Sequence, residues 1–333
     1  MTQPMTTPPK VFASQADLAE KTVSFTRLSE NAYAYTAEGD PNTGIFIGDE
    51  AVMVVDTQAT PGMAQDVIRR IREVTPLPIK YVLLSHYHAV RVLGASAYFK
   101  EGAEQIIASR DTYDLIVERG EQDKASEIGR FPRLFRNVES VPPGLTWPTM
   151  TFDGTMSVWL GKKLEVKIAQ IGRGHTKGDT IAYVENQNGS GEKICFAGDL
   201  VEYQSTAYAG DCYFRDWPTT LDRLSAYGFD KLVPGRGAAL ENPVDVKKAI
   251  ASTRAFISDV YTLVNNGVAA GKNLNTIYKE TMATLRPTYG HWVIFDHCMP
   301  FDVTRAYDEA TGYDHPRIWT AERDVEMWNT LEN

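Results

Sequence analysis

The chain of 333 residues has little cysteine, no excess of basic residues and no long apolar run. Its three cysteines, Cys195, Cys212 and Cys298, are odd in number and far apart, so they do not resemble a disulfide framework and they indicate a reducing compartment. The net charge of −9 argues against a nucleic-acid-binding surface, which is normally basic. No apolar run approaches the roughly 18 residues of a membrane span. We therefore expect neither nucleic acid nor membrane among the partners.

The N-terminal end lacks the apolar segment of a signal peptide. Residues 1–10 are rich in threonine and proline, and we expect residues 1–20 to form a flexible leader. Without a signal peptide, a membrane span or a disulfide framework, the predicted location is cytoplasmic.

Histidine is also scarce, but two of the six histidines lie two residues apart, as His86 and His88. The apolar run at 81–84 before them is typical of a strand, and a strand that enters a loop can aim residues i and i+2 in the same direction. Two imidazoles in this arrangement can bind one metal ion, but another ligand must come from elsewhere. Alone, the pair is more typical of two ordinary loop histidines than of a metal site.

Three further segments place polar side chains beside apolar, strand-like stretches. Residues 172–180 put His175 in a glycine-rich turn, and residues 195–200 put Asp199 at the end of a strand. Residues 52–57 end another apolar strand with Asp56.

Taken in order, these segments resemble the metallo-β-lactamase-fold hydrolase superfamily. The family pattern is a strand ending in Asp, then His-x-His-x-Asp-His, Gly-His-Thr-x-Gly, Gly-Asp, and a late His after a strand. The resemblance covers roughly residues 24–240 and implies an α/β fold, a four-layer αββα sandwich, here with extra C-terminal helices. We expect this domain over 21–240 and a helical extension, packed on the same domain, over 241–333.

The sequence departs from the family pattern at three positions. Val90 replaces the Asp of the histidine motif, Arg91 replaces its last His, and Arg236 replaces the late His. In the family these positions supply the second metal site, so the resemblance implies that this site has been remodelled as a unit. The residues that remain are those of the first site, His86, His88 and His175, with Asp199 at the position that bridges the two metals.

Three imidazoles with an open fourth position suit a catalytic zinc, which lowers the pKa of bound water to about 7. We therefore predict one divalent metal, with zinc favoured and iron or manganese as alternatives, because imidazole binds all three.

Asp199 either completes the ligand set, acts as general base, or pairs with an arginine. Asp56 is expected to orient the histidine loop from behind the ligands; a simple cap at the strand end is the alternative.

Arg91 and Arg236 together carry the two positive charges that a second divalent ion would have supplied. A guanidinium group binds a carboxylate through parallel hydrogen bonds and does not lose its proton. One hypothesis is that the arginines hold an anionic group of the substrate or polarise its carbonyl. The other is that they only pair with Asp199 and Asp56 and so keep the site folded.

The remaining pattern predicts the other elements. Residues 131–148 contain several prolines and aromatic residues and are a candidate wall or lid over the site, with a surface helix and loop as the alternative. His291 and His297 lie in an aromatic segment, where histidines usually have packing roles. Predicted strands are 31–35, 42–49, 105–108, 156–160, 164–168, 180–185 and 193–197, with turns at 153–154 and 188–191. Predicted helices are 61–74, 92–100, 111–128, 243–264, 273–283 and 301–309.

These features favour a metal-dependent hydrolase that uses one metal to cleave an ester, lactone, thioester or amide of a small molecule, with an anionic substrate favoured by the arginines. The alternatives are a mononuclear iron enzyme of redox or oxygen chemistry on a carboxylated substrate, and a non-catalytic binding protein on a decayed scaffold. His297 and residues 303–309 loosely resemble zinc metallohydrolases of the quinoprotein-relay and sulfur-oxidation-cluster type. The C-terminal helices are compatible with a lid or with the surface of a homo-oligomer.

Overall fold

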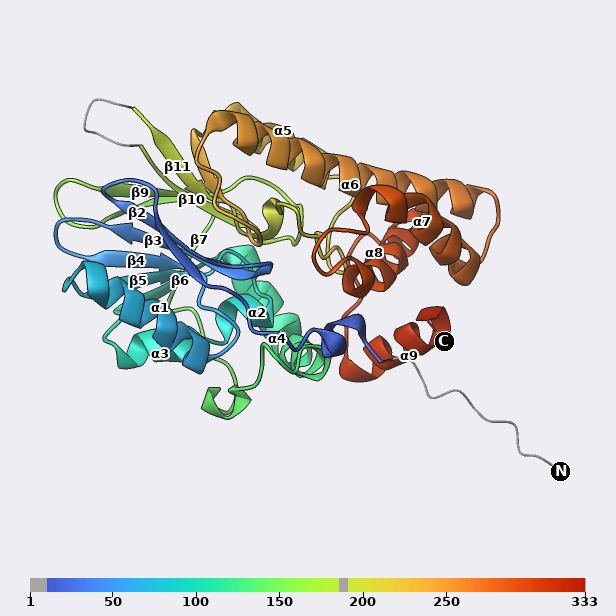
Figure 1. Ribbon diagram of the computed structural model, residues 1–333, viewed down its shortest axis with the longest axis horizontal. Coiled ribbons are helices and arrows are strands. Elements are labelled where there is room, and N and C mark those ends of the chain that lie inside the picture. The colour runs from blue at the N-terminus through green and yellow to red at the C-terminus, as the bar shows by residue number, and fades with distance from the viewer. Residues whose placement is uncertain (1–10, 186–190, 333) are drawn as a thin grey trace.

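Two β-sheets, packed face to face, form the centre of the computed structural model, which describes residues 11–185 and 191–332 (Figure 1). The first sheet has seven strands in chain order, antiparallel from β1 to β4 and parallel from β4 to β7. Its strands are β1 (Ser24–Arg27), β2 (Ala32–Ala37), β3 (Asp40–Ile47), β4 (Val52–Val55), β5 (Ile79–Leu83), β6 (Gln105–Ser109) and β7 (Met150–Phe152).

The second sheet has five strands in the order β12-β11-β10-β9-β8, antiparallel from β8 to β11 and parallel between β11 and β12. Its strands are β8 (Thr155–Trp159), β9 (Glu165–Gln170), β10 (Thr180–Glu185), β11 (Lys193–Phe196) and β12 (Lys231–Val233). The predicted pairing of β10 with β11 is confirmed, but residues 188–190 of its predicted loop lie outside the described residues. The predicted turn at 153–154 connects β7 to β8 and so links the two sheets.

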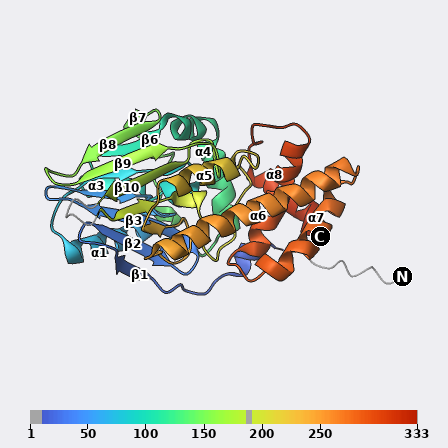
Figure 2. The ribbon, with the colours of Figure 1, turned by 90° about the horizontal axis from the view of Figure 1, so that it is seen from above.

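Helices cover the outer faces of both sheets, which gives the predicted αββα layers (Figures 1 and 2). Strand β4 illustrates why, since all four of its residues are buried. Val54 packs among the helices on one side, and Met53 packs against the second sheet on the other. The helices are α1 (Pro61–Val74), α2 (Ala89–Val92), α3 (Ala95–Lys100), α4 (Arg110–Arg130), α5 (Trp217–Ala226), α6 (Pro243–Ala269), α7 (Leu274–Tyr289), α8 (Phe295–Ala310) and α9 (Ala321–Glu332).

The helix predicted at 92–100 is wrong in its details, because the structure has two short helices, α2 and α3, joined at Gly94. Gly94 packs closely against the backbone at Thr57, the segment after β4. A Cβ at position 94 would lie 1.8 Å from the carbonyl oxygen of Thr57. The backbone N–H of Gly94 donates to the carbonyl of Gln58 at 3.1 Å. The break therefore lets the chain after the histidine loop pack closely on the segment after β4.

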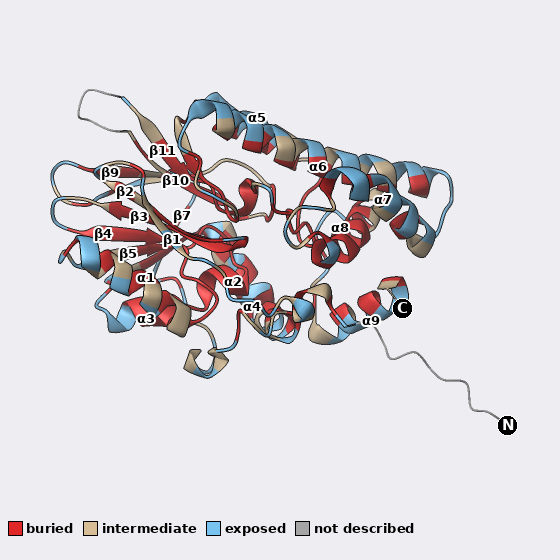
Figure 3. Ribbon diagram, in the orientation of Figure 1, coloured by how far each residue is buried: buried red, intermediate tan, exposed pale blue. Residues whose placement is uncertain are grey.

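The C-terminal helices are longer than predicted. Helix α6 extends to Ala269, α7 extends to Tyr289, and α8 begins at Phe295 instead of at 301. Helix α9 was not predicted at all. Helix α8 is buried on nearly all faces, between α6, α7 and α9, so it lacks the one-sided apolar pattern by which helices are identified (Figure 3).

The start of the described chain is packed against these helices. Phe12 is 7% exposed, and its ring lies 4.8 Å from that of Trp328 and 6.5 Å from that of Phe301. The predicted flexible leader at 1–20 is therefore corrected for residues 12–16, which include the short helix Ala13–Ala16, while residues 1–10 lie outside the described residues. The domain boundary at 240 stays a prediction. Within the described ranges, none of the helices has the length and apolar character to cross a bilayer.

Candidate metal centre

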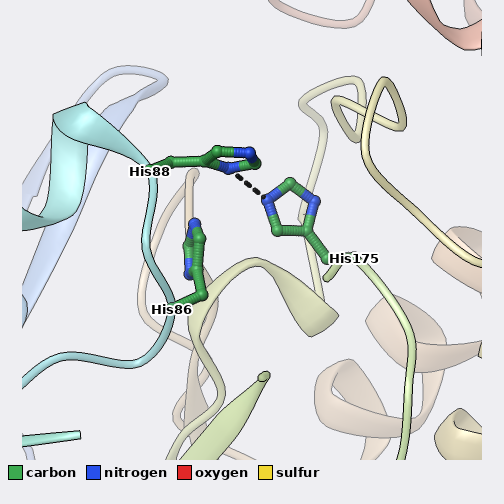
Figure 4. Close-up of side chains that lie close together, drawn as sticks. All are labelled: His86, His88 and His175. Carbon is green, nitrogen blue, oxygen red and sulfur yellow. Dashed lines mark hydrogen bonds between the residues drawn. The ribbon is translucent and has the colours of Figure 1, made fainter. Parts of the chain in front are cut away.

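Three histidines meet where the ends of the two sheets come together (Figure 4). His86 and His88 follow β5 of the first sheet, and His175 lies in the loop between β9 and β10 of the second. One nitrogen from each ring lies within 4.8 Å of the others, and the side chains are 1–3% exposed. Among the described residues, this is the one group of three or more His, Cys, Asp or Glu side chains whose ligand atoms lie close enough together to hold a metal ion.

His86 is oriented from behind by a serine and an aspartate. Its Nδ1 lies 2.9 Å from the hydroxyl of Ser85, and that hydroxyl donates to Asp56 at 2.8 Å. The other carboxylate oxygen of Asp56 accepts the backbone N–H of Ser85, also at 2.8 Å. This leaves Nε2 of His86 buried without a hydrogen-bond partner among the described residues. Asp56 thus supports the histidine loop through Ser85, without touching the ring of His86 itself.

His88 is oriented by Asp211, a residue that the sequence did not single out. Nε2 of His88 lies 3.1 Å from the carboxylate of Asp211, whose second oxygen accepts Nη1 of Arg119 at 3.1 Å. Nδ1 of His88 then faces Nε2 of His175 at 2.9 Å. Asp211 belongs to no family motif, and only the position of the His88 ring shows its role, so no local sequence signal could have found it.

The donor set fits a metal ion. Burial lowers the pKa of His86 well below its ordinary value and that of His175 to about 3, so both rings are neutral and carry a free lone pair. A buried nitrogen without a partner, as in His86, is costly unless another group satisfies it. Burial would lower the pKa of His88 too, but its hydrogen bond to Asp211 and the negative charge of Asp123 raise this pKa above its ordinary value. Three imidazoles with converging nitrogens are typical of a transition-metal site, and they do not fix which metal is bound.

Asp199 lies beside the histidines, in the short helix Gly198–Leu200 that follows β11. Its Oδ2 is 3.6 Å from Nε2 of His86 and 3.6 Å from Nε2 of His175. Burial alone would raise the pKa of Asp199, but the charge of Arg91, followed by those of the other neighbours, holds it well below its usual range. Asp199 is therefore an anion at neutral pH.

Both arginines contact Asp199, but they differ in what else they contact. Nη2 of Arg91 donates to Oδ1 of Asp199 and to the carbonyl of Gly235, and Nη1 donates to the carbonyl of Asn42. Arg91 is fully buried, and its partners Asn42 and Gly235 belong to β3 and to the segment after β12. This guanidinium group thus connects the ends of both sheets.

Arg236 lines the cavity next to the histidines. Its Nη1 donates to Oδ2 of Asp199 and to Glu202, both at 3.2 Å. Within the described part of the chain, no hydrogen-bond acceptor is recorded for its Nε or Nη2. Burial raises the pKa of Glu202 to about 8, so at neutral pH this carboxyl group is mostly uncharged and competes little for Arg236. Sequence reasoning also missed Glu202, which lies three residues after Asp199, just beyond the short helix Gly198–Leu200.

The cavity at the centre has a volume of about 10 Å³. A single water molecule needs roughly 10–15 Å³, so this space holds no more than one small guest. Within the predicted lid, residues 131–148, Phe131 is part of the cavity wall, whereas Trp147 is 43% exposed. His291 is exposed and is not part of the wall. The lining residues are His88, Val90, Glu127, Phe131, His175, Asp199, Tyr208, Arg236, Ile294, His297 and Cys298.

The structure thus brings most of the predicted site residues together. His86, His88, His175, Asp199 and Arg236 surround one point, with Arg91 behind Asp199 and Asp56 behind Ser85. Their chemical roles stay predictions. His297, for which packing was the expected role, lies at the cavity wall.

Comparison with known proteins agrees with this geometry. A family model described as the metallo-beta-lactamase superfamily matches residues 37–264. Among curated proteins, the 2,4-dinitroanisole O-demethylase subunit alpha of Nocardioides sp. (strain JS1661) is 26% identical over 198 residues, which are 56% of this chain and 50% of that protein. The matched part of the chain thus spans about half the length of this relative.

Two solved structures share the fold. A metallo-beta-lactamase from Pontibacter korlensis has a TM-score of 0.55 and 17% identity, and the match covers 71% of this chain and 99% of that chain. The DIM-1 metallo-beta-lactamase exposed to ceftazidime has a TM-score of 0.54 and 16% identity, with 72% and 98% covered. At this identity the likeness concerns the fold alone.

Proposed function

The chain belongs to the metallo-beta-lactamase superfamily, and on this premise we propose that it is a hydrolase that cleaves an ester, lactone, thioester or amide at a three-histidine site for a single metal. The observation that carries the proposal is the set of converging nitrogens, Nε2 of His86, Nδ1 of His88 and Nε2 of His175. The sequence lacks the second set of ligands, at Val90, Arg91 and Arg236.

A divalent ion held by these three nitrogens supplies Lewis acidity, which polarises a carbonyl group and acidifies water. The protein's own contribution is orientation. Asp211 fixes the tautomer of His88, and the pair of Asp56 and Ser85 fixes the ring of His86. A buried, sealed site also strengthens each electrostatic contact in it.

Asp199 and Arg236 have complementary roles in the proposal. Asp199 accepts a hydrogen bond from the attacking water and orients it, because its low pKa makes it a better acceptor of hydrogen bonds than of protons. Arg236 stabilises the negative charge that develops on the carbonyl oxygen, or holds an anionic group of the substrate. Arg91 positions Asp199 and does not reach the substrate, since it is fully buried, is not part of the cavity wall, and has Nη1 and Nη2 engaged by Asn42, Asp199 and Gly235.

Metal analysis combined with an esterase assay tests the proposal. Protein purified without added metal is analysed for zinc, iron and manganese, and its hydrolysis of 4-nitrophenyl acetate is compared with that of His86→Ala and of chelator-treated protein. We expect about one equivalent of zinc and a hydrolysis rate that chelation abolishes and zinc restores. Less than a tenth of an equivalent of any metal, with none taken up on reconstitution, would falsify the proposal. Iron with a visible absorption band favours redox chemistry instead.

A second candidate is the cleavage of an aryl methyl ether. It is favoured by the relative whose name gives 2,4-dinitroanisole O-demethylase activity, at 26% identity. In that reaction water and the ether would give a phenol and methanol, which needs the same oriented water and the same stabilisation of a departing anion. Release of the coloured 2,4-dinitrophenolate from 2,4-dinitroanisole measures this activity, and a rate above that on the ester favours the second candidate.

A further inference from the structure

A larger pocket opens on the outer side of the metal centre. It has a volume of about 290 Å³ and lies between the N-terminal segment and the start of α8. Two of its lining residues, Ile294 and His297, also line the inner cavity next to the histidines. The outer pocket and the metal centre are therefore separated by little more than these two side chains. The lining residues are Ala13, Ser14, Asp17, Lys21, Gly290, Trp292, Val293, Ile294, Phe295, Asp296 and His297.

The inner cavity is too small for a substrate. At about 10 Å³ it accommodates one water-sized group, so the body of an ester or ether has to lie outside it while the reacting end approaches the histidines. The outer pocket, at about 290 Å³, is close to the lower end of the volume range of small-molecule sites.

His297 has an environment that is unusual for a buried histidine. The residue is 1% exposed, yet neither ring nitrogen has a hydrogen-bond partner among the described residues. Its ring packs against Phe131 at 4.4 Å and Phe301 at 5.5 Å. Burial, together with Arg130 and Arg236 nearby, lowers its pKa well below the ordinary value, so the ring is neutral and offers one donor and one acceptor. Leaving two buried polar atoms unsatisfied costs stability, which a ligand could recover.

We propose that the outer pocket binds the non-reacting body of the substrate, and that His297 donates a hydrogen bond to the substrate's oxygen where the pocket meets the metal centre. This rests on the proposed hydrolytic function and adds to it the place of binding and a substrate-contacting residue. His297 lies outside residues 37–264, so the contact comes from the helical extension and not from the segment that matches the family.

The lining of the pocket indicates an uncharged substrate. Each of its ionic side chains is already paired: Lys21 with Asp17 at 2.9 Å, and Asp296 with Arg286 at 2.5 Å. The rest of the wall includes the aromatic rings of Trp292 and Phe295. Because no unpaired charge among the lining residues is available for an ionic substrate, the pocket fits a neutral aryl or alkyl group, and Arg236 is left for the reacting end.

The backbone at the boundary is held in a strained conformation. Ile294 has a φ of +58°, in the left-handed region that β-branched residues avoid. Its carbonyl accepts the N–H of His297 and of Cys298, both at 3.0 Å, and so begins α8. Val293 is fixed to the loop after Asp199, since its N–H donates to Gln204 and its carbonyl accepts from Thr206. The surrounding structure therefore determines where the side chain of His297 lies.

Binding of acetophenone, a neutral aryl ketone that cannot be hydrolysed, tests the pocket without turnover. Isothermal titration of the metal-loaded protein compares acetophenone with 4-acetylbenzoate, which keeps the ketone at the reacting end and adds a negative charge at the end of the ring that enters the outer pocket. We expect acetophenone to bind at least about tenfold more tightly. Tighter binding of 4-acetylbenzoate would overturn the assignment of a neutral group to the outer pocket.

Two pairs of variants locate the site. Ala13→Phe fills the outer pocket, whereas Ala16→Phe adds the same ring to the exposed side of the same short helix. We expect Ala13→Phe to weaken acetophenone binding about tenfold and Ala16→Phe to leave it unchanged. Equal binding by Ala13→Phe and the parent, at equal melting temperature, excludes the pocket.

His297→Phe and His297→Gln test the hydrogen bond. The phenylalanine removes two unsatisfied nitrogens, so we expect an unchanged or higher melting temperature together with about tenfold weaker acetophenone binding and a higher KM for 4-nitrophenyl acetate. The glutamine, which can donate, retains binding within about threefold. A purely structural histidine would give the reverse, a lower melting temperature and unchanged binding in His297→Phe. If acetophenone binding depends on Ala13 and His297 but the protein hydrolyses no ester, the result supports the pocket and counts against the hydrolase. If the protein hydrolyses the ester and neither Ala13→Phe nor His297→Phe changes KM, the result supports the hydrolase and counts against the pocket.

Discussion

At the scale of the residue, the centre is defined by how two arginines share one carboxylate. Arg91 is enclosed by backbone carbonyls and Asp199, whereas Arg236 contacts Asp199 and also lines the cavity. The sequence predicted both contacts with Asp199 as one of two hypotheses, because it showed two charges replacing two ligands. It could not separate the two residues, since Asn42 and Gly235, the further partners of Arg91, are far from Arg91 in the sequence and are brought to it only by the fold.

The two arginines are therefore expected to respond differently to removal. Arg236→Ala should lower kcat on 4-nitrophenyl acetate by about a hundredfold or more and change the melting temperature little. Arg91→Ala removes the buried guanidinium group that donates to Oδ1 of Asp199 and to the carbonyl of Asn42, and should reduce the free energy of unfolding by about 3–5 kcal/mol. Urea unfolding and steady-state kinetics measure the two effects. A collapsed melting temperature in Arg236→Ala with little change in turnover contradicts the assignment.

Asp211 should control metal affinity through the tautomer of His88. In Asp211→Asn the amide can donate to Nε2 of His88, which moves the ring proton to Nδ1, the nitrogen that faces His175. We expect zinc affinity, measured by competition with a chromophoric chelator, to fall by about tenfold to a hundredfold. Glu118→Gln is the matched control, because it also removes a carboxylate partner of Arg119 but does not touch His88. Equal affinities of both variants would refute the role of Asp211.

At the scale of the element, the parts that the sequence predicted are those with local, repeated signals. Strand β4 and the histidine loop follow from an apolar run that ends in polar residues, and α1 follows from Pro61 with apolar residues on one face. The start of α8 was missed because Ile294 adopts a conformation that its residue type disfavours. Helix α9 was missed although its apolar residues Met327, Trp328 and Leu331 have helical spacing and lie on its buried face, so the sequence did contain this signal.

The loop that contains His175 is expected to give the stability a measurable pH dependence. Asp179 accepts the N–H and the hydroxyl of Thr176, yet burial raises its pKa to about 7. Because the folded pKa exceeds that of the unfolded chain, the contribution of Asp179 is complete below about pH 4 and is lost as the pH rises through 7. Asp179→Asn removes this loss.

Thermal unfolding of metal-free protein between pH 4 and 8 measures the effect. The melting temperature of Asp179→Asn, relative to the parent, should rise across this interval. Parallel profiles of the two proteins would show that Asp179 does not titrate there.

At the scale of the whole molecule, the site is built where separate parts of the chain meet. The first sheet supplies His86 and His88, the second supplies His175 and Asp199, and the C-terminal helices supply His297. The family resemblance predicted the first four, because their motifs have a fixed order along the chain. The extension has no such motif, so its contribution to the cavity could be seen only in the folded protein.

The described ends of the chain should stabilise each other. Phe12 packs against Trp328 and Phe301, and Phe12→Ala is expected to reduce the free energy of unfolding by about 3 kcal/mol. Val11→Ala, at a side chain that is 61% exposed, is the control and should change it by less than about 0.5 kcal/mol. Urea denaturation measures both. A small effect of Phe12→Ala would mean that the segment before β1 is not part of the cooperative unit.

The position of Arg91 also limits how this protein could change by mutation. Exchanging Arg91 for the histidine of the family pattern removes the side-chain donor to the carbonyl of Asn42 and one of the two donors to the carbonyl of Gly235. Gly235 packs closely against Asp199, since a Cβ at position 235 would lie 2.0 Å from Oδ1 of Asp199. The side chain of Asp199 therefore has little space to move toward a new partner. A complete second set of family ligands would need changes at Val90, Arg91 and Arg236, and of these the change at Arg91 removes a fully buried guanidinium group that donates to Asp199. The cost of regaining the second set of ligands is thus concentrated at Arg91, the residue that connects the ends of both sheets.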